Sequence, residues 1–487
     1  SFGRWLSQQL PALPTEQFNP NIVGGMLATI VSCYVPLITL PRQSKHTLIR
    51  RWLPPLWATA GAITLVGAIL AVSRGAWVAL SITAGLWCLW RLRSPLQQHL
   101  RLPKWRYVIG GSLMVGVIAA LLITSMTPAA KLPGIAAFQN RLTLLKSGSR
   151  LARDYIFTGI GLGTFEMHYA VYQLLIHVGY VPHTHNLFLD LLIDLGLLGI
   201  IAYLWLIATA LVQGIQQIHR ADASTAWLIE TGLALQIMIV IHGLVDDVLF
   251  GSRALFLLFI PYGLLASTAC MVDVKSREEV STTRKTWTRF AYEVTLAILC
   301  FAVVVWWFPI LSAWHANLGA LAQARVELSH YDQTEFYLLS IDDIRQQEDL
   351  GRAIGSFEKA LTLNPKNLTA RQRLASIALA RGDATQALAH MQTAWEAHNR
   401  DATTRLLLGD SLVASGNVDL AVEIIRGQKF AKERLAGQAW SRYWVHDEWK
   451  QAIFAWQAVQ ALAPNDPNPD YWIRQAQERI QTGSASK

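Results

Sequence analysis

Eight long apolar runs limit what this chain can fold into. They cover residues 21–40, 53–73, 75–92, 107–127, 186–212, 226–248, 254–274 and 290–311. Each is long enough to cross a bilayer as a helix, which takes about 20 apolar residues. Only 15% of the 487 residues are charged, whereas a soluble protein has about 25%. The sequence therefore predicts an all-α protein with a polytopic membrane bundle of about eight helices.

The basic residues gather in the loops that alternate with these runs. The loops hold Arg42, Lys45, Arg50 and Arg51; Arg91, Arg93, Arg101, Lys104 and Arg106; Arg220; and Lys275, Arg277, Arg284, Lys285 and Arg289. All four loops fall on one side of the predicted bundle, which the positive-inside rule makes cytoplasmic. We therefore expect a multi-pass protein of the cytoplasmic (inner) membrane, with segment 128–185 and everything after residue 312 outside. These loops also account for the net charge of +9, so a nucleic-acid partner is not expected.

Two histidines stand just before the fifth apolar run, where the chain enters the membrane. His183 and His185 follow Pro182, and Asn186 comes directly before the first apolar residue of the run. On turn chemistry alone, this pattern is typical of a capped helix with histidines at the interface. A histidine is also a common general base near neutral pH. The pattern by itself leaves a structural and a catalytic role open.

Polar and small residues continue into this run. Asp190 and Asp194 follow Asn186 at intervals of four residues, so the three share one face of a helix. Carboxylates at that depth have to face other helices or a wet cavity rather than lipid. Gly196 and Gly199 are expected to provide small surfaces for close helix contact.

The pattern of His185-Asn186, nine further residues and Gly-Leu-Leu-Gly at 196–199 resembles the signature of the O-antigen ligase and O-antigen polymerase superfamily. Its members are membrane enzymes that move a glycan from a polyprenyl-diphosphate carrier to an acceptor. Two further features are similar to the family: Asn-Pro-Asn at 19–21 and Ser-Arg-Gly at 73–75. Family members usually carry several spans before the Asn-Pro-Asn, and this chain begins at Ser1, so we expect N-terminal spans to be missing.

The long outer segment has no obvious domain of its own, and such loops are usually functional. It contains Arg141, Arg150 and Arg153 in a pattern that predicts an amphipathic helix on the membrane surface. In the resembled family, an arginine stands thirteen residues before an aspartate, and a glycine-rich turn follows. Arg141, Asp154 and the turn at 159–163 match that arrangement. Arg150 and Arg153 remain competitors for the same role.

By resemblance, we assign Arg74 and Arg141 to the carrier diphosphate and His185 to the acceptor side. Arginine suits phosphate because it is always charged and its planar fork matches phosphate oxygens. Further substrate contacts are expected from Arg150, Arg153, Asn186, His183, Asn21 and Asp246. The pair Asp246-Asp247 is open to a divalent cation, but an ion pair with Arg253 or with the outer arginines is the stronger expectation. Neither a metal nor a cofactor is predicted.

The last part of the chain repeats about every 34 residues between 334 and 466. The small, large and small positions of a tetratricopeptide repeat fall at Ala353, Phe357 and Ala360, and a second copy begins at Ala387. Such repeats bury their faces against their neighbours and form a solenoid that binds partners more often than it catalyses. We therefore expect that deleting the repeats spares chemistry on a small acceptor and weakens use of the natural one.

The predicted organisation favours a glycosyltransferase at the outer face of the membrane, with a lipid-linked glycan donor and a protein partner on the repeats. The expected parts are spans 1–4 at 1–127, an outer loop with site residues at 128–185, spans 5–8 at 186–311, a connecting helix at 312–333, and a repeat solenoid with a capping helix at 334–487. The acceptor stays open: lipid for a ligase, glycan for a polymerase, polypeptide for a protein O-oligosaccharyltransferase.

Two other classes of function compete with transfer. A bicarbonate-type anion transporter should show paired broken helices near the midplane, and the sequence predicts none. A non-catalytic scaffold that presents the repeats would have no need for Arg74, Arg141 and His185, which are all present.

Overall fold

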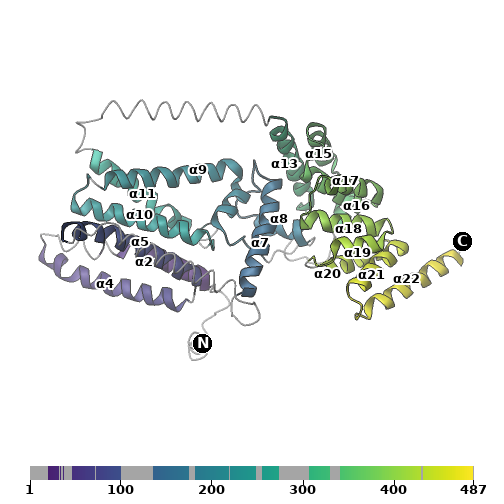
Figure 1. Cartoon of the computed structure of the whole chain (residues 1–487), viewed down its shortest axis with the longest axis horizontal. Coiled ribbons are helices and arrows are strands. Elements are labelled where there is room, and N and C mark those ends of the chain that lie inside the picture. Colours follow the sequence, from purple (N-terminus) through teal and green to yellow (C-terminus); the bar gives the residue numbers. More distant parts are fainter. Residues whose placement is uncertain are drawn as a thin grey trace. The chain divides into compact units, whose positions relative to one another are not determined.

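The computed structural model describes residues 20–31, 33–34, 37, 46–71, 73–99, 135–174, 181–218, 220–247, 250, 255–273, 307–329, 341–428 and 431–485. Within these ranges every regular element is a helix, as the sequence predicts (Figure 1). The chain folds into two compact units. The membrane unit comprises residues 1–152, 158–165 and 182–283, and the repeat unit comprises residues 153–157, 166–181 and 284–487.

The membrane unit is built from apolar helices. They are α2 (Pro20–Val31), α4 (Thr47–Leu70), α5 (Arg74–His99), α7 (Ile135–Asp154, whose last two residues count with the repeat unit), α9 (Leu187–Gln217), α10 (Ala223–Gly243) and α11 (Leu255–Asp273). Within the described ranges, three helices are long and apolar enough to cross a membrane: Thr47–Leu70, Leu187–Gln217 and Ser224–Gly243. The expected span at 107–127 and most of that at 290–311 lie outside the described residues, so the total of about eight spans stays a prediction.

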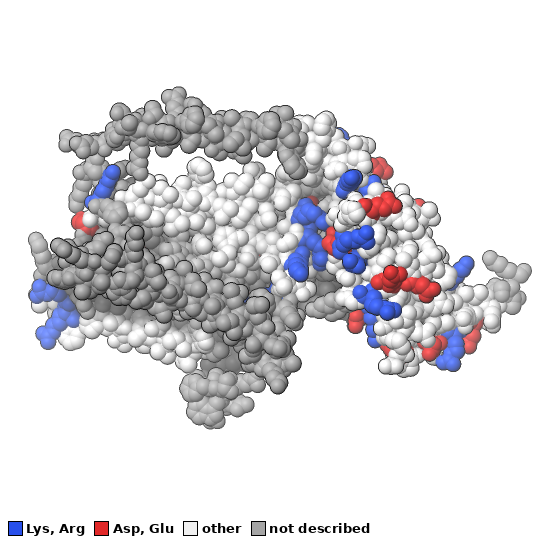
Figure 2. All heavy atoms as spheres, in the orientation of Figure 1, with Lys and Arg blue, Asp and Glu red and all other residues white. Residues whose placement is uncertain are grey.

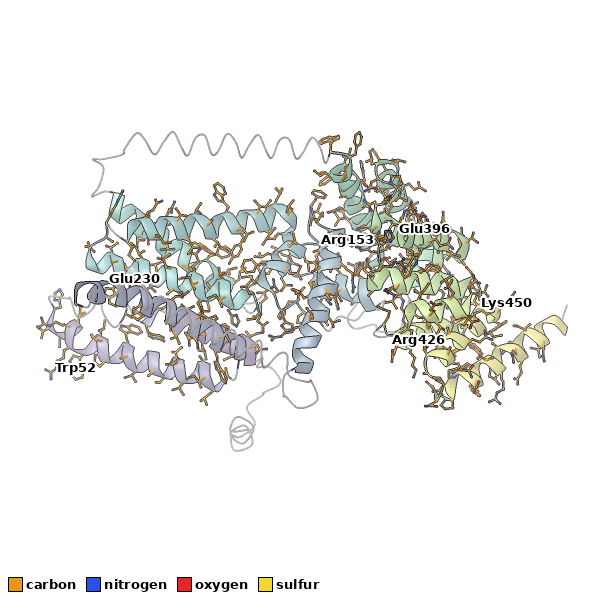
Figure 3. The ribbon with its side chains drawn as sticks, in the orientation of Figure 1. Trp52, Arg153, Glu230, Glu396, Arg426 and Lys450 are labelled. Atoms are coloured by element: carbon orange, nitrogen blue, oxygen red, sulfur yellow. The ribbon has the colours of Figure 1, made fainter. Side chains whose placement is uncertain are left out.

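The outward faces of these helices are apolar. On α4, Trp52, Ile63 and Val66 are each more than half exposed (Figure 3). Figure 2 shows few charged side chains on the visible described surface of the membrane unit, while the repeat unit carries both signs. Large exposed apolar surfaces are unusual on a soluble protein, so these faces are suited to lipid.

The core of the membrane unit lies where α9, α10 and α11 meet. Its most buried apolar side chains include Leu191, Ile229, Ile239, Leu258 and Leu265. Glu230 is a carboxylate within α10, and it is almost fully buried. It accepts a hydrogen bond from Nε1 of Trp87 on α5 at 3.2 Å, which offsets part of the cost of burying its charge (Figure 3).

Helix α9 is broken at Gly196, which corrects the expectation that this glycine serves close helix contact. Its backbone has φ 70° and ψ −169°, a conformation that only glycine adopts without strain. The break leaves the carbonyls of Ile193 and Asp194 without helical partners. They accept hydrogen bonds from the backbone N–H groups of Ile160 at 2.8 Å and Gly161 at 3.1 Å. The glycine-rich turn of the outer segment therefore packs against the break in α9.

The repeat unit contains only helices within its described residues. They are α8 (Phe165–Tyr169, whose first residue counts with the membrane unit), the π-helix η3 (Ala170–Leu174), α13 (Trp307–Glu327), α14 (Ile341–Gln347), α15 (Gly351–Leu363), α16 (Leu368–Ala380), α17 (Ala384–Glu396), α18 (Ala402–Ala414), α19 (Val418–Ile425), α20 (Ala431–Gln438), the π-helix η4 (Ala439–Trp444), α21 (Trp449–Leu462) and α22 (Asn468–Ala485). Neighbouring helices pack in pairs, such as α13 with α15, α16 with α17 and α18 with α19 (Figure 1).

The predicted repeat positions are buried. Ala353, Phe357 and Ala360 are at most 1% exposed, and Ala387 of the next copy is fully buried. Phe357 packs against Gly319 of α13 so closely that a Cβ there would lie 2.6 Å from the ring. Helix α13 (Trp307–Glu327) therefore packs with the repeats. It overlaps the connecting helix that the sequence predicts at 312–333.

Candidate active site

The loop before α9 presents both predicted histidines, and the next residue caps the helix. The side-chain oxygen of Asn186 accepts the backbone N–H of Leu189 at 2.9 Å, as an N-cap does. Its Nδ2 donates to the carbonyl of Leu244, just past the end of α10, at 3.0 Å. Asn186 thus ties the start of α9 to the end of α10, and its contact with substrate stays a prediction.

His185 is held by a buried carboxylate. Its Nδ1 lies 2.8 Å from Oδ1 of Asp246, which is 3% exposed and also accepts the backbone N–H of Asp247 at 3.0 Å. His185 has φ 60°, a left-handed conformation that is uncommon for a residue other than glycine. Strain of this kind often marks a functional position.

Arg141 binds the other oxygen of the same carboxylate. Its NH2 lies 3.0 Å from Oδ2 of Asp246, and its NH1 donates to the carbonyl of Val245 at 3.1 Å. That carbonyl is free because α10 ends at Gly243. The Arg141 side chain is still 36% exposed, so part of the guanidinium faces outward. Asp246 thus joins Arg141 and His185, which are 44 residues apart in the chain.

The electrostatics of this cluster keep Asp246 ionised. Burial works to raise its pKa, but the hydrogen bond and charge of His185 and the charge of Arg141 lower the pKa below the usual value. His183 behaves differently, because burial and the neighbouring His185 lower its pKa to about 4. Nδ1 of His183 accepts the backbone N–H of His185 at 3.3 Å. His183 is therefore neutral at physiological pH and supports the loop.

The polar stripe of α9 faces protein, as expected. Asp190 accepts the backbone N–H of Thr184 at 2.8 Å, and Asp194 accepts that of Gly163 at 2.9 Å. Both carboxylates are less than 10% exposed. They fasten the histidine loop and the glycine turn to the first turns of α9.

Two regions of the chain match known families. Residues 59–204 match the family described as O-antigen ligase, a range that includes Arg74, Arg141 and both histidines. This part of the chain is therefore similar to the O-antigen ligases. Residues 378–432 match the tetratricopeptide repeat. The resemblance predicted from the sequence is therefore confirmed, although Asp246 lies beyond the matched range. No curated protein matches the chain.

The other arginine assigned to the diphosphate, Arg74, is the first residue of α5, and its side chain lies outside the described residues. The neighbours of the next residue, Gly75, show what the start of this helix packs against. A Cβ on Gly75 would lie 3.0 Å from Cγ2 of Val245 and 3.6 Å from Nε2 of His242. The first turn of α5 therefore lies beside the end of α10, next to the carbonyl that Arg141 binds.

No described contact brings the other predicted site residues to this cluster. Arg150 donates to Oγ of Ser147 on its own helix at 3.2 Å. Arg153 makes its contacts within the repeat unit. Asn21 is the second residue of α2 and is partly exposed, and Arg253 lies outside the described residues. Their roles as substrate contacts stay predictions.

One group of described residues in the membrane unit has the donor atoms for a metal ion. Ligand atoms of His183, His185 and Asp246 lie within 4.8 Å of one another. However, His185 and Asp246 already touch through a hydrogen bond of 2.8 Å, and Arg141 places a fixed positive charge on the same carboxylate. This geometry fits a hydrogen-bonded relay better than a cation site, and the absence of a metal stays a prediction.

Proposed function

We propose that this chain is a membrane glycosyltransferase that moves a glycan from a polyprenyl-diphosphate carrier to an acceptor at the outer face of the cytoplasmic membrane. The observation that carries the proposal is the position of His185 and Arg141 on opposite oxygens of buried Asp246. The match to the O-antigen ligase family supports it. The proposed proton acceptor and the proposed phosphate-binding cation thus contact the same buried carboxylate, that of Asp246.

The proposed reaction divides the work between these residues. Nε2 of His185 takes the proton from the acceptor hydroxyl while that oxygen attacks the anomeric carbon of the donor. The bond from the anomeric carbon to the phosphate oxygen breaks, and its electron pair leaves with the carrier diphosphate. Arg141 and Arg74 bind the developing charge of the diphosphate, where a preorganised cation acts most strongly.

Asp246 is a positioning residue in this mechanism. It accepts the hydrogen on Nδ1 of His185, which leaves Nε2 free to take a proton. Because its pKa is lowered, Asp246 stays ionised and stabilises the imidazolium that forms. It also orients the guanidinium of Arg141.

The test is the product formed from a purified lipid-linked oligosaccharide by the reconstituted chain. A single transfer to a lipid identifies a ligase, a ladder of glycans a polymerase, and a glycosylated polypeptide a protein O-oligosaccharyltransferase. His185→Ala should abolish whichever product forms. A folded, membrane-inserted His185→Ala chain with full activity would overturn the mechanism.

No described contact favours the competing transporter. Transporters use broken helices whose unwound carbonyls coordinate the ion, and α9 is broken at Gly196. The carbonyls freed there, on Ile193 and Asp194, are already bound by backbone N–H groups of the glycine turn.

A further inference from the structure

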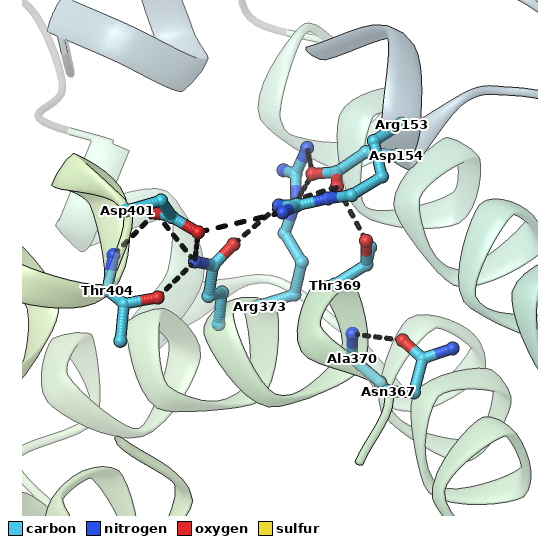
Figure 4. Close-up of polar contacts among 9 residues, drawn as sticks. Arg153, Asp154, Asn367, Thr369, Ala370, Arg373, Asp401 and Thr404 are labelled. Carbon is cyan, nitrogen blue, oxygen red and sulfur yellow. Dashed lines mark hydrogen bonds and ion pairs between the residues drawn. The ribbon is translucent and has the colours of Figure 1, made fainter. Parts of the chain in front are cut away.

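A short segment of the outer loop packs into the repeats. Residues Arg153–Phe157 comprise the last two residues of α7 and the three residues that follow it. They belong to the repeat unit. Asp154 is the centre of this packing and is 1% exposed. Its Oδ1 accepts the hydroxyl of Thr369 at 2.7 Å, and its Oδ2 lies 3.1 Å from Nε and 3.0 Å from NH2 of Arg373 (Figure 4).

The residues on either side of Asp154 are also held. Arg153 donates to Oε1 of Gln372 at 2.7 Å and lies 3.7 Å from Oδ2 of Asp401 on the loop before α18 (Figure 4). Tyr155 is 2% exposed, and its hydroxyl donates to the carbonyl of Ala320 at 3.3 Å.

The backbone of the segment is fixed as well. The N–H of Phe157 donates to Oδ1 of Asn317 on α13 at 2.9 Å. The guanidinium of Arg373 lies 4.7 Å from the ring centre of Tyr172 in η3, which follows the glycine turn. Two stretches of the outer segment, on both sides of that turn, therefore contact the same arginine.

The residues of α16 that bind the segment lie on one face of the helix. Thr369, Gln372 and Arg373 are spaced at i, i+3 and i+4, so they share one side of the helix. Burying Arg373 and Asp154 is favourable only because each pairs with the other. This surface is the kind that repeats use to bind a partner, and here it is occupied by the chain's own segment.

We propose that this face of α16 is the receptor for Arg153–Phe157, and that their docking positions Arg141 for the donor. Arg141 and Asp154 lie on one helix without a described interruption, separated by thirteen residues or about 20 Å. Fixing the last turn of α7 thus restrains the helix that carries Arg141. Asp154, Thr369 and Arg373 are positioning residues, and this second half of the proposal rests on the proposed function. It replaces the expectation from the sequence that deleting the repeats spares chemistry on a small acceptor.

The test uses the full chain in lipid nanodiscs and two readouts. The first is backbone hydrogen exchange in peptides that cover Tyr155 to Thr158, which report the Phe157 N–H. The second is binding of undecaprenyl diphosphate. Thr369→Val keeps the shape of the side chain but removes the hydroxyl that Asp154 accepts, and Arg373→Met removes the ion pair.

Both variants should raise exchange in these peptides and weaken binding of undecaprenyl diphosphate by up to about tenfold, because losing a hydrogen bond to a charged group destabilises the docked segment by about 1.5 kcal/mol or more. The matched control is Thr362→Val, whose hydroxyl only bonds the carbonyl of Lys359 on its own helix. It should change neither readout.

Unchanged exchange in both variants would overturn the docking. Faster exchange with unchanged binding would overturn the positioning of Arg141. A wild-type chain that protects these peptides but does not bind undecaprenyl diphosphate would contradict the proposed function and leave the docking intact, so the two failures are distinguishable.

Discussion

At the scale of single residues, the two histidines should behave differently although they are neighbours. His185→Ala should leave binding of the lipid-linked donor nearly intact and abolish transfer, because only His185 is held by Asp246. His183→Ala should slow transfer only modestly, since His183 supports the loop through its Nδ1. Donor binding and single-turnover transfer in the reconstituted chain measure the two effects separately.

The pH profile distinguishes a base from a cationic ligand at His185. A neutral base loses activity as pH falls, whereas a cation that binds phosphate loses activity as pH rises. His183 should add no step between pH 5 and 8, because its pKa is about 4. A profile that declines only on the alkaline side would contradict the role of His185 as base.

Arg141 is expected to tolerate lysine poorly. Arg141→Ala should weaken donor binding and slow transfer by roughly 30- to 1000-fold, corresponding to about 2–4 kcal/mol. Arg141→Lys should recover only part of this, because a point charge cannot bind Asp246, the Val245 carbonyl and a phosphate together. Arg150→Ala is the control, since Arg150 bonds Ser147 on its own helix. Equal loss in Arg150→Ala would reopen the choice between these arginines.

Asp246 should make folding stability depend on acid pH. Its pKa is lowered in the folded protein, so its ionised form stabilises the fold above the ordinary carboxyl value of about 4. That contribution is lost as pH falls through the lowered pKa. The difference in melting temperature between wild type and Asp246→Asn should therefore be large at neutral pH and shrink as pH falls through the lowered pKa of Asp246. A difference that does not change with pH would exclude this account.

At the scale of elements, the contact between the glycine turn and the break in α9 should be sensitive to an added methyl group. A Cβ on Gly159 would lie 2.3 Å from the carbonyl oxygen of Asp194, and its φ is +65°. Gly163 has a similar φ of +70°, but no atom lies within 4 Å of its Cβ position.

Gly159→Ala should therefore destabilise the fold clearly more than Gly163→Ala, which costs only the backbone strain of about 1 kcal/mol. Melting temperatures of the full chain in detergent compare the two. Similar losses would mean that the turn can move away from α9.

Local patterns predicted some of these elements and missed others for a physical reason. The repeat helices are predictable because small and large residues recur with the helix period. The roles of His185 and Arg141 follow from a resemblance and stay predictions. The break at Gly196 was missed, since a glycine in an apolar run is read equally well as a contact surface. The docking of Asp154 was also missed, because Arg373 lies 219 residues away and no periodic signal joins them.

At the scale of the whole molecule, the repeats are predicted to lie on the outer side of the membrane. In a background without Cys33, Cys88, Cys270 and Cys300, Lys450→Cys on α21 should react with an impermeant thiol reagent on intact spheroplasts. Arg50→Cys, in the first turn of α4 on the side expected to be cytoplasmic, should react only after the membrane is opened. The opposite pattern would reverse the orientation.

The membership of Arg153–Phe157 in the repeat unit also limits how such proteins can be recombined. A designer who joins the membrane unit to another repeat array through a single junction after residue 283 would separate Asp154 from Arg373 and Thr369. The exchangeable module is therefore discontinuous: it includes the two stretches of the outer loop at 153–157 and 166–181 together with the repeats. Chimeras that transfer all three pieces should fold where single-junction fusions fail.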